Sequence, residues 1–278
     1  MTILVTGATG KVGRNVVTGL LDAGRTVRAI SRSPQRAGLP EDVEVLRADL
    51  ADPATLRAAL DGVDKVFVFP TAPDGTRALT AAAAQAGVRH LVLLSSTVPG
   101  YPKPNPISDA HLAHERIVQD ADLPWTFVRP GGFMSNDLAW AHSIRSGSVV
   151  RDPCPGSAVA LIDERDIAAV AVAALLDDTH VGQVHEITGP RSLTPVQRTR
   201  ILARAIERPL RFETLPAAEF TQVVTQQGYP PEYATAMLDF GAHFAAAPGP
   251  VYTTVERITG RPPYTYADWA AQHVERFR

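Results

Sequence analysis

The stretch Ile3–Leu21, which reads ILVTGATGKVGRNVVTGLL, decides the fold of this chain. It opens with a short apolar, β-branched run and continues with apolar residues at helical spacing. The stretch therefore predicts a strand that passes through a tight turn into a helix. Three glycines, Gly7, Gly10 and Gly13, are spaced three apart across that turn. Such glycines indicate that backbone atoms must come close to a ligand or to a neighbouring element.

The rest of the first half alternates between strand-like and helix-like segments. Apolar, β-branched runs occur at Ile3–Thr6, Thr26–Ile30, Val43–Leu46, Val66–Phe69, Leu91–Leu94 and Thr126–Val128. Helical spacing occurs at Val12–Ala23, Pro53–Leu60, Thr76–Ala86 and Ala110–Ala121. Strands joined by helix-length connections predict a parallel sheet covered on both faces, which is the doubly wound α/β (Rossmann) fold.

The pattern changes after about residue 150. Asp163-Glu164-Arg165-Asp166 leads into an Ala/Val-rich helix, with Asp166 as the expected N-cap, and a further strand is expected at Val184–Thr188. Proline-broken helical segments dominate from Thr194 onward. We expect a Rossmann domain over residues 1–190 and a smaller, mostly helical domain over 191–278, with elements that interleave across this approximate boundary.

Composition excludes several classes of protein. The formal net charge of the 278 residues is −2, whereas a nucleic-acid binder usually has a strongly basic binding surface. A single cysteine, Cys154, excludes an internal disulfide, and no signal-peptide features precede the first strand. The most apolar stretch, Ile167–Leu176, is too short to span a bilayer. We expect a cytoplasmic protein with a small-molecule substrate and neither nucleic acid nor membrane as partner. The sequence does not decide whether the protein forms a homodimer.

The glycine loop sits where a dinucleotide site requires it, between a first strand and a first helix. Gly7 permits the turn, Gly10 lets backbone amides approach a pyrophosphate, and Gly13 lets the helix pack close to the strand. The helix N-terminus adds unpaired N–H groups that attract phosphate. The alternative, a turn with glycines for packing only, is disfavoured by the surrounding βαβ pattern.

The second strand predicts which dinucleotide is bound. An NAD site usually places an acid at the end of this strand, but Thr26–Pro34 contains none. Arg32 stands there instead, and a guanidinium suits the 2′-phosphate of NADP. Lys11 and Arg14 are expected to add positive charge nearby. The sequence therefore predicts NADP(H) as cofactor.

Several motifs together resemble the atypical short-chain dehydrogenase/reductases. They are the glycine loop with Arg32, Ala48-Asp49-Leu50, Ser95-Ser96, Phe127–Asn136 (FVRPGGFMSN) and the tail Val255–Pro263 followed by Trp269. Within these, the chain most resembles NmrA-like proteins, which include NAD(P)H:quinone oxidoreductases. By this resemblance Asp49 and Leu50 flank the adenine, Ser95 lies near the nicotinamide ribose, and Pro130–Phe133 edge the nicotinamide. The full set implied for the cofactor is Gly7, Thr9, Gly10, Lys11, Val12, Gly13, Arg32, Asp49, Leu50, Phe69, Pro70, Ser95, Pro130, Gly131 and Phe133.

One feature departs from the ordinary members of that superfamily. These use a tyrosine and a lysine four residues apart on a helix, where the lysine prepares the tyrosine to donate a proton. With Glu115 as reference, Ile107 occupies the tyrosine position and His111 the lysine position. We therefore expect hydride transfer to a quinone-like or conjugated acceptor that needs little acid help. His111 is the candidate catalytic residue, as a ribose contact or a modest general acid.

Other residues complete the prediction. Tyr101, Phe133, Met134 and Trp140 are candidates for the substrate pocket, whereas Tyr229, Tyr233, Phe240 and Phe244 are assigned mostly to the core. His111, His114 and Glu115 lack the order of a zinc motif, so no metal is expected. Two other functions stay open: a non-catalytic NADP-sensing regulatory protein, and a non-redox NADP-binding enzyme of secondary metabolism.

Overall fold

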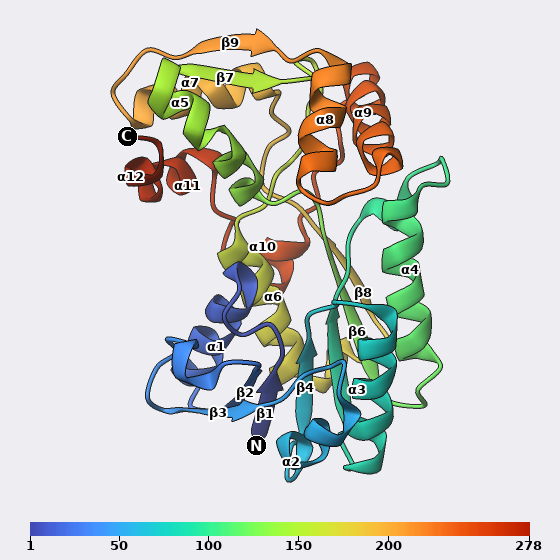
Figure 1. Cartoon of the computed structure of the whole chain (residues 1–278). Helices are drawn as coiled ribbons and strands as arrows, with labels where there is room; N and C mark the ends of the chain where they lie inside the picture. The colour runs from blue at the N-terminus through green and yellow to red at the C-terminus, as the bar shows by residue number, and fades with distance from the viewer.

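The computed structural model describes all 278 residues, and a seven-stranded parallel sheet forms its centre (Figure 1). The strand order is β3-β2-β1-β4-β5-β6-β8. The strands span Thr2–Val5 (β1), Thr26–Ser31 (β2), Val43–Arg47 (β3), Lys65–Val68 (β4), His90–Leu94 (β5), Trp125–Pro130 (β6) and Val184–Ile187 (β8). The order reverses between β1 and β4, the switch point at which such sheets bind ligands. The predicted doubly wound fold is confirmed.

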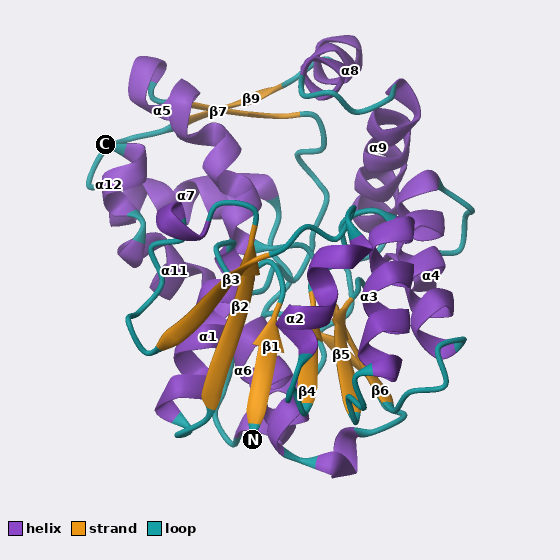
Figure 2. Cartoon of the chain, turned by 60° about the horizontal axis from the view of Figure 1, so that its bottom comes forward, coloured by secondary structure: helices purple, strands orange, loops and turns teal.

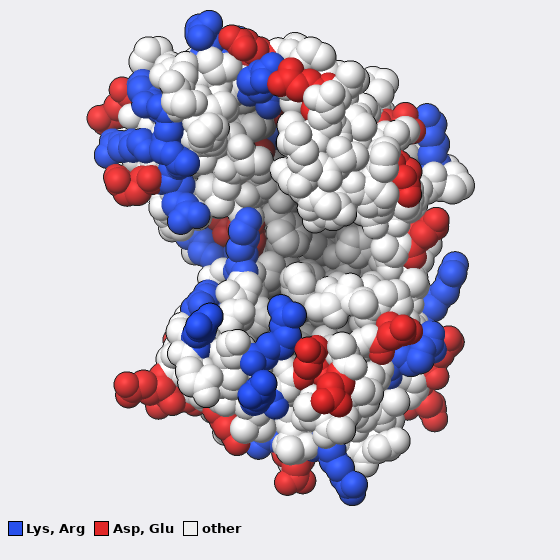
Figure 3. Space-filling model, in the orientation of Figure 1, with Lys and Arg blue, Asp and Glu red and all other residues white.

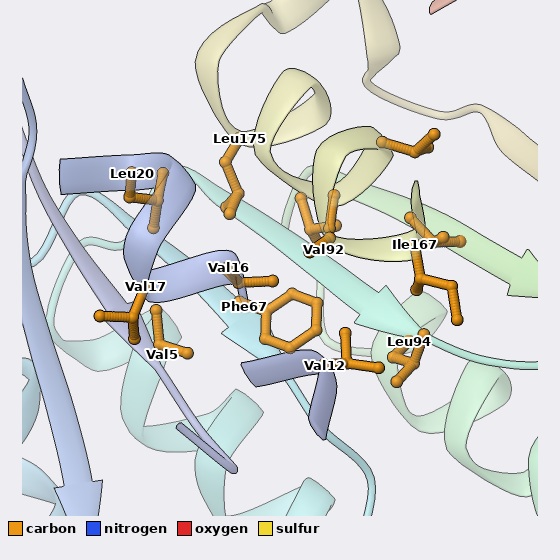
Figure 4. Packing of buried hydrophobic residues seen from close by; sticks show 14 of the residues in the cluster. Val5, Val12, Val16, Val17, Leu20, Phe67, Val92, Leu94, Ile167 and Leu175 are labelled. Atoms are coloured by element: carbon orange, nitrogen blue, oxygen red, sulfur yellow. The ribbon is translucent and has the colours of Figure 1, made fainter. Parts of the chain in front are cut away.

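Helices cover both faces of this sheet (Figures 1 and 2). One face packs against α1 (Lys11–Asp22), α6 (Glu164–Leu176) and α10 (Thr254–Thr259), and the other against α2 (Leu56–Leu60), α3 (Pro73–Gln85) and α4 (Pro106–Gln119). Figure 4 shows Phe67 of β4 beside Val12 and Val16 of α1, all with 2% exposure or less. Each such side chain stabilises the fold by about 1.5–3 kcal/mol through burial. None of the helices combines the length and apolar character that a membrane crossing needs.

The start of α6 corrects one prediction. Asp163, not Asp166, is the N-cap, and its carboxylate accepts a 2.8 Å hydrogen bond from the Arg165 amide. Asp166 lies inside the first turn and is fully buried. Its carboxylate binds Arg261 at 2.8 Å and accepts the Tyr264 amide at 2.8 Å. Asp166 therefore tethers the C-terminal segment to the Rossmann sheet, which a cap could not do.

The remaining elements form a second layer above the carboxyl ends of the strands (Figure 1). They are α5 (Ala141–Gly147), α7 (Pro195–Ala205), α8 (Ala217–Gln226), α9 (Pro231–Ala246), α11 (Tyr266–Gln272), α12 (Val274–Phe277) and the parallel pair β7 (Val149–Asp152) and β9 (Arg211–Thr214). Short 3₁₀ helices are η1 (Pro34–Arg36), η2 (Pro53–Thr55), η3 (Val98–Gly100), η4 (Met134–Trp140) and η5 (Asp178–His180). The pair β7–β9 is not predicted by the sequence, because each strand has only four residues and its partner is distant.

A separate apolar cluster holds this layer together. It combines Met134–Leu161 with side chains from 193–277 around the fully buried Trp269. Residues on both sides of residue 190 therefore share one core. The chain crosses between the two layers more than once. A domain boundary at residue 190 therefore stays a prediction.

Histidines gather at the amino-terminal edge of the sheet, away from the switch point. His90 is 1% exposed, and its Nε2 lies 2.9 Å from Thr126 Oγ1. His185 Nε2 lies 3.0 Å from His180 Nδ1. Burial, followed by neighbouring positive groups such as Lys65 for His90 and His180 for His185, lowers the pKa of both His90 and His185 to about 4.

We expect this cluster to make the fold acid-sensitive. The folded pKa of each histidine lies below its unfolded value, so the unfolded chain binds more protons and stability is lost as the pH falls from about 6.5 towards 4. The loss should be on the order of 1–2 kcal/mol between pH 7 and 4.5. Urea unfolding at each pH measures it. His185→Gln should flatten the dependence, whereas His142→Gln, at an exposed position, should not. If the free energy of unfolding depends equally on pH in the unmodified protein and in both variants, the assignment is contradicted.

Candidate functional site

The glycine loop forms a tight cradle at the start of α1. Gly7 has φ +61°, in the left-handed region, and its carbonyl accepts the Gly10 amide at 2.9 Å. A Cβ on Gly13 would lie 2.1 Å from the Gly7 oxygen, which is not tolerable. No side chain caps the helix, which begins at Lys11. Its first amides are therefore free to bind an anion, so the loop fits the pyrophosphate of a dinucleotide.

A groove of about 960 Å³ continues from this loop across the carboxyl ends of the central strands. It brings together six of the residues expected at the cofactor: Gly7, Thr9, Arg32, Asp49, Leu50 and Phe69. Arg32 is exposed and forms no ion pair. The size of the groove, the glycine cradle and the available guanidinium of Arg32 all fit the adenosine half of NADP(H).

Ser33 and Arg36 are among the groove residues that the sequence did not predict. Arg36 ends η1, which begins at Pro34 directly after the Arg32–Ser33 turn. The short helix brings Arg36 back to the same groove as Arg32. A proline two residues after Arg32 was a usable signal, because proline favours the first position of a helical turn.

Two basic residues expected beside Arg32 lie elsewhere. The Lys11 ammonium donates to Ser135 Oγ at 2.9 Å, so it reaches towards η4. The Arg14 guanidinium donates to the carbonyls of Gly38 at 2.6 Å and Ala37 at 2.8 Å. Arg14 therefore holds the loop after η1 in place instead of presenting free charge to the cofactor.

The other expected cofactor residues lie around the glycine loop and the ends of β4, β5 and β6. Val12 is buried in the core, so only its backbone amide can serve a ligand. Pro70 follows β4, and Pro130 ends β6. Gly131 follows, and its amide donates to Ile187 at 2.8 Å. Phe133 packs partly buried against the core under α1.

A buried ionic network lies at the ends of β5 and β6. Glu115 of α4 is 3% exposed and accepts the Ser95 hydroxyl at 2.5 Å. Its two carboxylate oxygens also receive Arg129 Nε at 2.8 Å and Nη2 at 2.5 Å. The Glu115 hydrogen bond raises the pKa of Arg129. The network fixes Ser95 and the end of β6. The sequence alone predicted no role for Glu115, which served only to align this helix with the tyrosine and lysine positions.

His111 lies one turn before Glu115 on α4 and is partly buried. It is not among the residues that line the cavity described below. Burial, more than the neighbouring His114, lowers the pKa of His111. The imidazole is therefore neutral at neutral pH, which weakens a general-acid role. His114 instead bonds Thr76 Oγ1 at 2.8 Å, so the two histidines and Glu115 do not converge on a common point.

A cavity of about 470 Å³ lies between the sheet edge and helices α8 and α9; we call it the α9 cavity. Its lower rim is Thr97, Val98 and Gly132, directly beyond the ends of β5 and β6. Figure 3 shows the hollow between the two layers, with largely uncharged walls. Tyr101 spans the gap: its hydroxyl donates to the Asp239 carbonyl at 3.1 Å.

The expected substrate residues divide between this cavity and the core. Tyr101 lines the cavity, and its contact with substrate stays a prediction. Met134 and Trp140, at 1% and 7% exposure, lie in the core around Trp269 and do not line this cavity. Phe240 and Phe244 line the cavity although they were assigned to the core. Helical spacing alone cannot separate these positions, because both a core and a pocket wall require an apolar face.

Known proteins with similar sequences also bind NAD(P)H. Residues 7–178 match a family model described as NAD(P)H-binding. The chain belongs to this family. It is 44% identical over 281 residues to the (4-alkanoyl-5-oxo-2,5-dihydrofuran-3-yl)methyl phosphate reductase of Streptomyces griseus, covering 99% of both chains. It is 37% identical to the NAD(P)H azoreductase of Xenophilus azovorans, again covering 99% of both.

A solved structure supports the same assignment. The NADPH complex of an Escherichia coli NADPH-dependent quinone oxidoreductase has TM-score 0.83 and 25% identity, with 97% of this chain and 99% of that chain covered. The expected resemblance to NmrA-like, atypical short-chain dehydrogenase/reductases is confirmed. As a member of this NAD(P)H-binding family, the chain is an NAD(P)H-dependent oxidoreductase.

Gly13→Ala tests the cradle. Because its Cβ would lie 2.1 Å from the Gly7 oxygen, α1 must move away from the turn. We expect NADPH affinity to fall more than tenfold, measured by isothermal titration. Gly147→Ala is the matched control, since its Cβ would meet no atom closer than 3.8 Å. Unchanged NADPH affinity in Gly13→Ala would overturn the assignment of the loop.

Proposed function

We propose that the protein transfers hydride from NADPH to a quinone-like or conjugated small-molecule acceptor without a Tyr/Lys pair. The observation that carries this proposal is the α9 cavity, whose apolar walls begin at the ends of β5 and β6. When bound, reduced nicotinamide supplies the hydride. The chain supplies the cradle, the fixed strand ends and a cavity that is open on one side.

The chemistry of the acceptor explains how a missing proton donor is tolerated. Hydride added to a quinone or to a doubly activated double bond leaves an oxyanion that is already delocalised. Its proton can come from water that enters the open side of the cavity, so no strong acid is required at the site. Neutral His111 agrees with this scheme, and we retain His111 as a proposed contact for the nicotinamide ribose.

The relatives support the same acceptor class. The 5-oxo and 4-alkanoyl groups in the name of the Streptomyces reductase both conjugate with its ring double bond. The second relative is named for azo compounds, and the solved structure for quinones. All of these acceptors contain an extended conjugated system.

A panel of acceptors tests the proposal. NADPH oxidation should be stimulated by a simple naphthoquinone or an alkylidene lactone, and not by unactivated ketones. His111→Gln should keep turnover within about threefold and leave the pH profile between 6 and 8 unchanged. If no acceptor stimulates NADPH oxidation, the sensing and non-redox alternatives replace the proposal. If His111→Gln loses 100-fold or more with a changed pH profile, His111 is the acid after all.

We also propose that Arg32 and Arg36 together select NADP(H) over NAD(H). Both line the groove and are exposed, so the 2′-phosphate can gain two charge-assisted hydrogen bonds. Arg32→Ala should reduce the ratio of NADPH to NADH affinity by about tenfold, and the double variant by about 100-fold. Arg25→Ala, which removes an exposed charge outside the groove, is the control. A ratio that does not change in the double variant would reverse the NADP assignment.

A further inference from the structure

We propose that the α9 cavity accepts an uncharged conjugated acceptor with an apolar substituent and rejects anionic acceptors, phosphate esters included. The inference deepens the proposed function and rests on it. It also separates this chain from its Streptomyces relative, whose named substrate is a phosphate.

Two carboxylates on the cavity wall carry the first part of the argument. Glu186 lies in β8 and Asp152 ends β7, so the sheet and the upper layer each contribute one acid. Neither carboxylate forms an ion pair with Lys, Arg or His within 4.0 Å. The Asp152 carboxylate accepts only the Cys154 amide, at 2.9 Å. The cavity therefore presents negative charge that no cation balances by direct contact.

The lysine and arginine side chains near the cavity all have carboxylate partners. Arg198 lines the wall and is 5% exposed, but its Nε lies 2.8 Å from the carboxylate of buried Asp137. Arg129, next to Glu186 across the β6–β8 pairing, is held by both oxygens of Glu115. An incoming phosphate would therefore share the charge of either guanidinium with a buried carboxylate, which weakens the attraction.

The rim offers no better anion site. Lys103, on the loop that follows Tyr101, has its ammonium 3.9 Å from the Asp239 carboxylate of α9. The Tyr101 ring lies edge-on to Phe240, with centroids 4.5 Å apart. This contact places an aromatic surface at the mouth of the cavity, where a planar uncharged group can pack.

The opposite wall is apolar and explains the substituent. Phe220 of α8 and Met237, Phe240 and Phe244 of α9 line this side. His243 of α9 also lines the cavity, but no Asp, Glu, Lys or Arg of α8 or α9 does. An alkyl or aryl group therefore gains burial there, at about 0.8 kcal/mol for each CH₂.

A glycine contact brings α9 close to the loop after β7. Gly241 of α9 packs directly on Cys154, since a Cβ at residue 241 would lie 2.0 Å from the sulfur. Both residues line the cavity, so this contact sets the position of the α9 wall.

Equilibrium dialysis against the NADP⁺-bound protein tests the inference without hydride transfer. The probes are 1,4-naphthoquinone, its 2-butyl derivative and its 2-sulfonate. We expect the sulfonate to bind at least tenfold more weakly than the parent, because it meets unbalanced carboxylates. The butyl derivative should bind about tenfold more tightly than the parent. A sulfonate that binds as tightly as the parent would overturn the inference.

Variants assign these differences to residues. The double variant Glu186→Gln, Asp152→Asn should bring the sulfonate to within about threefold of the parent, and Asn keeps the oxygen that accepts the Cys154 amide. Phe240→Ala should remove the butyl preference. Glu232→Gln, an exposed acid on the same helix but outside the cavity, should change neither. Unchanged discrimination in the double variant would contradict the role of the carboxylates.

The outcomes also separate this inference from the proposed function. Charge discrimination in binding, together with no NADPH oxidation by any acceptor, would support the cavity assignment and refute the reaction. Faster turnover of the sulfonate than of the parent would support the reaction and refute the cavity assignment.

Discussion

The close approach of Gly13 to the Gly7 carbonyl is the contact on which the site depends. No side chain fits between them, so α1 packs closely against the turn that follows β1. This places the positive end of the helix dipole and its unpaired amides at the switch point between β1 and β4. The same packing sets Val12 and Val16 against Phe67 in the main core (Figure 4). Anion binding and core packing therefore share one geometric requirement, and neither can be relaxed alone.

The second constraint is the Glu115–Arg129 pair at the edge of the cavity. In α4, Glu115 fixes both Ser95 and the end of β6. A buried carboxylate without its guanidinium would be strongly destabilising, so both groups must be retained together. The edge of the site is thereby rigid and structural. This arrangement suits an enzyme that positions its reactants and leaves proton delivery to solvent.

Much of the fold could be predicted from the sequence because its signals are local. Buried parallel strands are continuous apolar runs, and Gly7–Gly13 lies between a strand and a helix, so the doubly wound sheet follows. The upper layer could not be predicted in the same way. The strands β7 and β9 are four residues each and pair across about 60 positions of sequence, and no local pattern announces such a partner. The N-cap of α6 was misplaced by three residues for a related reason: Asp163 and Asp166 are equally good caps locally, and only the distant Arg261 distinguishes them.

The residues of the site also differ in whether local sequence predicts their position. The position of Arg32 in the groove was predictable because strand ends in this fold have fixed places, whereas Trp140 lies in the core and Phe240 lines the cavity, the reverse of the expectation. Both are aromatic residues on helical segments, and their surroundings depend on distant elements, which are α7 and α11 for Trp140 and the α8–α9 hairpin for Phe240. The cavity exists only because this returning hairpin closes over the sheet edge, where Tyr101 meets Phe240. Residues from both halves of the chain therefore line the cavity, while the first half alone lines the groove beside the glycine loop. The wall of the cavity can consequently change in the α8–α9 hairpin without disturbing the glycine loop or the sheet.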